Sequence, residues 1–228
     1  MNKFMVKRLQ GIILGVGVCG CLLFAPVVAN AASGGDISLP APQIKEGMSV
    51  MQALDIRQSS RSFAETGISA SQLSHILWAA NGINRPETDG RTNPAALGVR
   101  SVEVYAVTEK GIYLYQPKTH ALKTVAEGDF RMATTMGQDF VGKAPITLVY
   151  VSNADAWQKS SHIPPVDKQV KFDSIAAGAM AQSVGLVAAS EGLGTCVRGS
   201  IDHEAFAKVA HLQKGQTVVI AQTIGVLP

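Results

Sequence analysis

The sequence predicts an α+β fold in which helices flank a central, mainly antiparallel sheet. Three observations predict this class: short runs with the alternation or β-branching of strands, a Lys-Gly turn that joins two such runs, and segments of helical periodicity around them. The order and type of these elements favour one α+β domain. No internal repeat or low-complexity tract interrupts the pattern.

Two helices are expected ahead of the first strand. Met48–Ile56 carries apolar residues close to one helical face, and a serine at its second position is a candidate N-cap. Ser69–Ala80 begins with the Ser-x-x-Gln spacing of a capping box and continues with an apolar stripe. Residues 81–96 follow as a long polar loop, and such a loop in a compact domain is usually functional or disordered.

The strands are expected in the middle and at the end of the chain. An alternating run precedes the Lys-Gly turn, an apolar, β-branched run has the character of a buried central strand, and a last buried strand closes the chain. In order, the expected strands are Val102–Val107, Ile112–Tyr115, a short one within Pro117–Val125, Ile146–Val151 and Gln216–Gly225.

Three more helices are expected between and after these strands, at Asp129–Phe140, Phe172–Ser190 and His203–Ala210. The second is rich in alanine and glycine, so another backbone can pack tightly against it. Gly192 is a suitable left-handed stop for that helix.

Residues 1–31 are expected to be a secretory signal peptide outside the fold. Lys3, Lys7 and Arg8 form a positive n-region, Gly11–Val28 is almost wholly apolar, and residues 29–31 form a small-x-small cleavage site. The expected protein is therefore exported, periplasmic or extracytoplasmic, with no stable membrane insertion after leader cleavage. Residues 32–46 are expected to be an N-terminal arm, and residues 47–228 the folded domain.

Two patterns inside the leader suggest other interpretations. Gly15–Gly20 matches G-x-G-x-x-G, but that fingerprint requires a preceding strand and a following helix, so it is not interpreted as a nucleotide site. A minor alternative is that the protein is a lipoprotein, with lipid attached to Cys21. The residues before Cys21 make a poor lipobox, so the cleaved signal peptide is preferred.

Charge and cysteine content narrow the function classes. The leader holds three of the 20 basic residues and none of the 17 acidic ones, so the remaining 197 residues carry no net charge. This balance gives no support for nucleic-acid binding. Cys196 alone remains, so no internal disulfide is expected. The five histidines lack metal-ligand spacing, and no serine-hydrolase elbow is present, so neither chemistry is expected.

Three segments are candidates for one pocket. Arg57–Arg61 sets two guanidinium groups around hydroxyls, a donor set that suits a phosphate monoester; a solvated basic turn is the alternative. Arg91–Ala96 closes the long loop. Gly192–Ser200 follows the long helix, and its glycines let backbone N–H groups approach a flat ligand; a helix cap followed by a turn is the alternative.

With these segments in order, the chain resembles the nitroreductase family over about Ala53–Pro228. It is most similar to exported, short members related to the SagB-type dehydrogenase domain. The motifs that carry the resemblance are Arg57–Phe63, Leu77–Pro86, Arg91–Ala96, Gln138–Phe140 with Ala144-Pro145, Gly192–Asp202 and Gln222–Gly225.

The resemblance implies that flavin mononucleotide (FMN) binds at a homodimer interface. The family's phosphate and ribityl contacts are matched by Arg57, Ser59 and Arg61, with Gln58 beside them. The family's C-terminal basic residues have no match before Pro228, so the two arginines are expected to be the main positive charges on the phosphate.

Two further segments match the parts of the family that bind the flavin ring. The loop along the ring, expected from the other subunit, is matched by Pro94, Ala95 and Ala96, and Gly98 stands where an asparagine usually contacts the flavin. The segment whose backbone faces the flavin is matched by Val197, Arg198 and Gly199, and the Gly199 N–H is the candidate donor to N5. No side chain is expected to act as a nucleophile, because the flavin carries the hydride chemistry.

The implied function is an FMN-dependent oxidoreductase that passes electrons from a reductant, with NAD(P)H as one candidate, to an electron-poor small molecule by ping-pong turnover. Two alternatives stay open: a flavin-binding or redox-silent interaction protein without turnover, and a SagB-like dehydrogenase. Because the chain is expected to be exported, its donor outside the cytoplasm need not be NAD(P)H.

Overall fold

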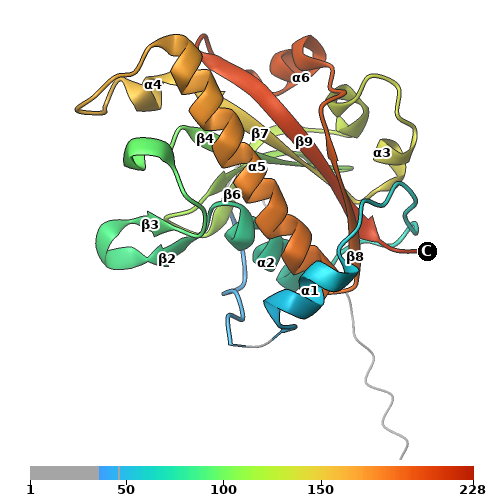
Figure 1. Cartoon of the computed structure of the whole chain (residues 1–228). Helices are drawn as coiled ribbons and strands as arrows, with labels where there is room; N and C mark the ends of the chain where they lie inside the picture. The colour runs from blue at the N-terminus through green and yellow to red at the C-terminus, as the bar shows by residue number, and fades with distance from the viewer. Residues whose placement is uncertain (1–35, 46) are drawn as a thin grey trace, which may run out of the picture. The chain divides into compact units, whose positions relative to one another are not determined.

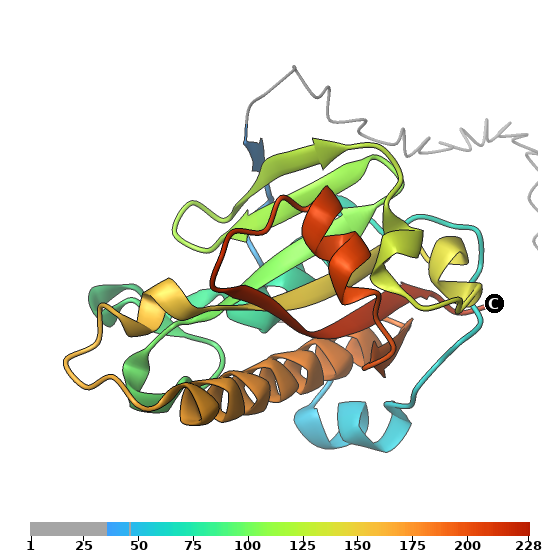
Figure 2. The same cartoon turned by 90° about the horizontal axis from the view of Figure 1, so that it is seen from above.

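The computed structural model describes residues 36–45 and 47–228 (Figure 1). The predicted signal peptide, the discarded glycine motif and the Cys21 alternative all lie outside these residues. In the described part, a seven-stranded sheet runs through the middle and helices cover both of its faces, as Figure 2 shows from above. The expected α+β class is confirmed.

Each pair of neighbouring strands in the large sheet is antiparallel. In spatial order the strands are β1 (Ile37–Ser38), β6 (Ala121–Glu127), β5 (Gly111–Gln116), β4 (Val102–Thr108), β7 (Ile146–Asn153), β9 (Gln216–Val226) and β8 (Leu193–Arg198). The apolar run of β7 lies between β4 and β9 and is buried along its first six residues, as its sequence predicts.

Two hydrophobic cores form, one on each face of the sheet. On one face, α2 (Ala70–Asn81) and α5 (Val166–Ser190) pack on the strands, and α1 (Val50–Ile56) lies beside α5. On the other face, α6 (His203–Val209) covers a second core near the 3-10 helix η3 (Arg131–Thr134). By length and composition α5 would also suit a membrane crossing, yet one side of it is buried in the fold, as expected of a core helix.

Local sequence signals account for the helix starts. Ser49 with Gln52, and Ser69 with Gln72, form complete capping boxes at α1 and α2. The α5 helix begins at Val166, six residues earlier than predicted, directly after Pro165. The extension is polar and mostly exposed, so it lacks the small-residue pattern on which the prediction rested.

Three local predictions are wrong or incomplete. Asp129–Phe140 is not one helix: η3 and the short α3 (Phe140–Lys143) are separated by a turn in which Gly137 has a φ of +82°. The loop 81–96 contains a small hairpin of β2 (Ile83–Arg85) and β3 (Gly90–Arg91), with a 3-10 turn between them. Gly192 does end α5, with a φ of +72°, but a strand, β8, follows it rather than a turn.

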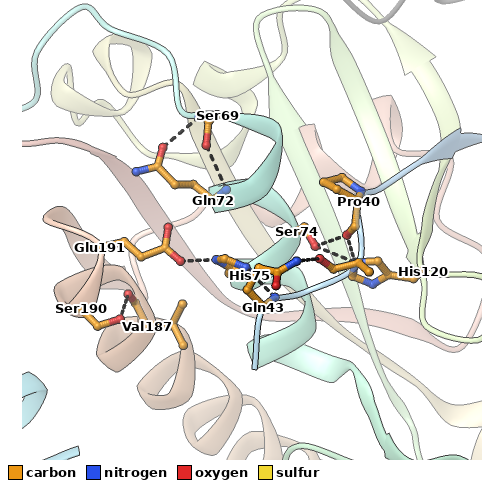
Figure 3. Close-up of polar contacts among 11 residues, drawn as sticks. Pro40, Gln43, Ser69, Gln72, Ser74, His75, His120, Val187, Ser190 and Glu191 are labelled. Atoms are coloured by element: carbon orange, nitrogen blue, oxygen red, sulfur yellow. Dashed lines mark hydrogen bonds and ion pairs between the residues drawn. The ribbon is translucent and has the colours of Figure 1, made fainter. Parts of the chain in front are cut away.

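The described part of the N-terminal arm is extended and docked on the domain (Figure 3). Its strand β1 pairs with β6 at the sheet edge. Beyond β1, the Pro40 carbonyl accepts a hydrogen bond of 2.6 Å from the Ser74 hydroxyl, and the Gln43 N–H donates to His75 Nε2 at 2.9 Å. The other ring nitrogen of His75 pairs with Glu191 at the end of α5. Side chains of α2 thus hold the arm in place.

Candidate functional site

The arginine segment begins where α1 ends. Arg57 is the C-cap of α1, and its N–H donates to the Ala53 carbonyl at 2.9 Å before the chain becomes extended. The extended segment then runs beside β8. Ser59 forms a parallel bridge with Thr195, and the Ser60 N–H donates to the Thr195 carbonyl at 2.8 Å. Two segments distant in sequence, 57–61 and 193–198, therefore lie side by side.

Glycines make this close approach possible. A Cβ atom on Gly194 would lie 2.9 Å from the Ser60 Cβ and 2.6 Å from Leu227 Cδ2, so a larger residue would push the arginine segment off the strand. A Cβ on Gly185 of α5 would lie 3.6 Å from Arg57 Cδ, so the stem of Arg57 packs against this small residue. Both contacts fix where the Arg57 side chain leaves the protein.

The polar side chains of the arginine segment are not used within the fold. Among the described residues, none forms a hydrogen bond or ion pair with the side chains of Arg57, Gln58, Ser59 or Arg61. Arg57 is half-buried and the other three are exposed. Two guanidinium groups, an amide and a hydroxyl are thus free of partners among the described residues, and donors of these types suit a phosphate monoester.

The β8 strand continues this site toward Gly199. The Val197 side chain is 47 % exposed, two positions after Thr195 and therefore on the same face of the strand. Gly199 lies beyond the strand end, where a Cβ would meet no atom within 4 Å. Its N–H has no acceptor in the part of the chain that the structure describes. At about 3.3 Å per residue, Thr195 to Gly199 spans about 13 Å along the chain.

The side chain of Arg198 faces the opposite way and is only 4 % exposed. Its Nε donates to Thr223 Oγ1 at 2.9 Å and one Nη donates to the Thr134 carbonyl at 2.9 Å. Burial lowers the pKa of this guanidinium to about 10. The backbone of Arg198 can face a ligand on the solvent side, whereas its side chain belongs to the layer behind the strand.

The first half of the Arg91–Ala96 segment is structural. Arg91, Thr92 and Asn93 donate side-chain hydrogen bonds to carbonyls in the last turn of α2, at Trp78, Ala79, Ala80 and Asn81. Burial lowers the pKa of Arg91, and its ion pair with Asp89 opposes that shift. These three side chains cap the helix, so Arg91 is committed to the fold and is not a free anion ligand.

The second half of that segment is presented outward. Ser183 on α5 donates to Asn93 Oδ1 at 2.5 Å and anchors the loop, after which Pro94 is exposed while Ala95 and Ala96 are half-buried. Leu97 and Gly98 have φ values of +53° and +71°. A left-handed backbone favours glycine, so Gly98 suits this conformation.

Within one chain, the structure brings together two of the three predicted segments. Arg57 packs at Gly185, whereas Ala95 lines a small cavity with Ala176 and Met180. The loop also meets α5 at Ser183, through Asn93. Ser183 and Ala176 lie two and nine positions before Gly185, so at about 3.6 residues per turn both lie on roughly the opposite side of α5. The Pro94 loop and the arginine segment therefore contact different sides of this helix in the single chain.

Sequence reasoning missed the roles of Asn93, Ser183 and the Arg198 side chain. Each role includes a contact between residues at least 25 positions apart, such as Arg198 with Thr223 or Ser183 with Asn93. Recognising β8 as a strand would have supplied one signal, because alternation then directs Val197 and Arg198 to opposite faces.

The fold and this donor set define a domain that suits an anionic, mononucleotide-like ligand. The chain belongs to the nitroreductase family, whose sequence pattern matches residues 54–226. This membership supports an oxidoreductase activity of the nitroreductase type.

Individual relatives agree with this assignment. The chain is 28 % identical over 176 residues to a candidate nitroreductase of Methanocaldococcus jannaschii, covering 73 % of this chain and 86 % of that protein. A crystal structure of a candidate nitroreductase from Ralstonia eutropha is 38 % identical and superposes with a TM-score of 0.78, over 85 % of this chain and 90 % of that one. The NADPH:FMN oxidoreductase of Vibrio harveyi, solved with NAD⁺, shares the fold at 16 % identity and a TM-score of 0.58, over 78 % and 67 % of the two chains.

Proposed function

We propose that this protein is an FMN-dependent oxidoreductase of the nitroreductase type that works as a homodimer. The observation that carries the proposal is the unpaired donor cluster of Arg57, Gln58, Ser59 and Arg61, which lies against β8. Bound there, FMN supplies the capacity to accept and release an electron pair. The protein's own residues bind the cofactor, orient it and exclude water.

In this proposal the two ends of the site have different tasks. Arg57, Ser59 and Arg61 hold the phosphate through charge-assisted hydrogen bonds, with Gln58 beside them. The free N–H of Gly199 donates to the edge of the ring, and Val197 offers an apolar contact on the solvent side. No side chain of this chain needs to form a covalent bond with the substrate.

The proposed homodimer accounts for two features of the single chain. The α1 helix exposes large apolar side chains, with Met51 75 % and Val50 65 % exposed, and Ile175 on α5 is also exposed. A second copy packed on this side would bury them. It would also bring its own Pro94, Ala95 and Ala96 toward the donor cluster, because the loop of the same chain contacts the other side of α5.

The proposed reaction passes electrons from a reductant to an electron-poor small molecule in two half-reactions. NAD(P)H is one candidate donor, supported by the NADPH:FMN oxidoreductase of Vibrio harveyi among the proteins of this fold. The predicted signal peptide favours another donor outside the cytoplasm. Steady-state kinetics with NADPH and with non-nicotinamide reductants separate these two cases.

The visible absorption spectrum of the purified mature protein tests the proposal. We expect the absorption bands of an oxidised flavin, either as isolated or after reconstitution with FMN, and bleaching when a reductant is added under anaerobic conditions. A colourless dimer that takes up no FMN would overturn the enzyme proposal. A protein that binds FMN but whose spectrum no tested reductant changes would instead favour a redox-silent binding role.

A further inference from the structure

Arg198 carries a buried positive charge that the rest of the fold does not balance. Its side chain is 4 % exposed, and no carboxylate in the described ranges forms an ion pair with it. Burying a charge is costly unless it is paired and hydrogen-bonded. Uncharged oxygen atoms accept the hydrogen bonds of the Arg198 guanidinium, so its positive charge is not compensated.

Those acceptors come from four places around the end of β8. Nε donates to Thr223 Oγ1 on β9 at 2.9 Å. The Nη groups donate to the carbonyl and hydroxyl oxygens of Thr134, at 2.9 and 3.3 Å, and to Gln138 Oε1 at 3.4 Å. One Nη also donates to the Ser200 carbonyl at 3.3 Å.

The contact with Ser200 has a consequence for Gly199. The side chain of Arg198 donates to the carbonyl of Ser200, so it joins the two residues that flank Gly199 and restrains the backbone between them. Gly199 has no side chain of its own to fix its conformation, and it is exposed. The guanidinium therefore sets the direction in which the free Gly199 N–H points.

We propose that Arg198 is a positioning residue that aims the Gly199 N–H at the flavin ring and whose buried charge favours the reduced cofactor. The inference rests on the proposed FMN site. Uptake of two electrons and one proton leaves a single negative charge on the flavin ring system. A positive charge just behind the strand lowers the free energy of that charged state relative to the neutral oxidised one, because little water intervenes to screen it. Arg198 thus raises the midpoint potential of the bound cofactor.

The effect of the charge at position 198 can be tested by varying pH, because the groups around Arg198 are nearly all uncharged. The groups that reach it from β9, η3, the turn before α3 and Ser200 are hydroxyls, an amide and carbonyls, none of which titrates. Cys196 is the titratable side chain that interacts with it electrostatically. A lysine at position 198 would keep the charge at low pH and lose it as pH rises, because burial lowers the pKa of lysine.

The experiment measures the midpoint potential of bound FMN against pH for wild type, R198K and R198M. We expect R198M to lie below wild type throughout. R198K should match wild type near pH 6 and fall toward R198M as pH rises. A tenfold loss in the preference for reduced over oxidised FMN corresponds to about 30 mV. The wild-type potential at each pH is the control, because any effect of Cys196 or of the flavin's own protonation is common to all three proteins.

The possible results of this experiment separate the inference about Arg198 from the proposed function. Coincident potential curves for all three proteins would overturn the inference while leaving the proposed function intact. A wild type that binds no FMN would overturn both. If R198M does not fold, the pH dependence of R198K decides alone. If neither variant folds, a wild-type potential below that of free FMN in the same cell would overturn the inference, and one above it would support it.

Discussion

Ser183, on α5, donates a hydrogen bond of 2.5 Å from its hydroxyl to Oδ1 of Asn93. The amide nitrogen of Asn93 donates in turn to the carbonyls of Ala79 and Ala80, at 2.6 and 2.9 Å. One buried asparagine thus joins α5, the end of α2 and the loop that presents Pro94. The orientation of that loop depends on a pair of residues 90 positions apart.

Ser183→Ala should destabilise the domain by about 1–3 kcal/mol, because it leaves the buried Asn93 Oδ1 without a donor. Urea denaturation of the apoprotein measures this change directly. Ser174→Ala is the matched control, since Ser174 lies on the same helix, is exposed and bonds only to the Val170 carbonyl one turn back. Equal midpoints for the two variants would show that the Ser183 contact does not hold the loop.

Arg57→Ala should weaken FMN binding by about 1.5–3 kcal/mol, because it removes a charged donor from the phosphate. Quenching of flavin fluorescence on titration of the apoprotein gives the dissociation constant. Lys168→Ala is the control: it removes one positive charge from the exposed start of α5, 17 residues before Gly185, where Arg57 packs. Unchanged affinity in Arg57→Ala would remove this residue from the phosphate site.

Local signals in the sequence predicted much of the fold. The candidate N-cap Ser49 and the capping box at Ser69 set two helix starts, and the β-branched run of β7 identified the central strand. The predictions failed where distant contacts decide the conformation. A turn after the cap at Gly192 was one of two interpretations of the sequence, yet β8 forms there because β9 pairs with it and Gly194 admits Ser60. Gly137 breaks the helix expected over 129–140.

The candidate site was predictable in composition but not in geometry. The Arg57–Arg61 segment and Gly192–Ser200 were singled out on residue type, and the structure places them side by side. The direction of the Arg198 side chain and the capping role of Arg91 could not be predicted. Each depends on which carbonyls come within reach once the sheet and α2 have packed.

His120 should make stability depend on pH. Its Nδ1 lies 2.8 Å from the Tyr115 hydroxyl. Its Nε2 lies 2.7 Å from the Ser74 hydroxyl, which itself donates to the Pro40 carbonyl (Figure 3). This arrangement suits a neutral ring that donates from Nε2 and accepts at Nδ1. Burial lowers the pKa of His120; its contact with the Pro40 carbonyl opposes this shift and the charge of His75 adds to it.

Since the folded pKa lies below the unfolded value of about 6.5, the unfolded chain binds the proton first as pH falls. The stability that His120 contributes is full above that value and is lost as pH decreases through it. Urea denaturation between pH 8 and pH 5 should therefore give a smaller loss of unfolding free energy in His120→Asn than in wild type. Asparagine tolerates the φ of +46° at this position. Equal losses of unfolding free energy in the two proteins would show that His120 is not the source of the pH dependence.

Met51→Glu should shift the proposed homodimer toward the monomer. Met51 is exposed on α1 among other apolar side chains, and a carboxylate there would lose its hydration if a second copy covered the helix. Size-exclusion chromatography with light scattering, over a dilution series, measures the dissociation. Thr66→Glu adds the same charge to an exposed loop outside α1 and should leave the mass unchanged. If Met51→Glu stays dimeric at every concentration at which wild type does, α1 does not form part of the interface, and the loop carrying Pro94 must reach the donor cluster by another packing.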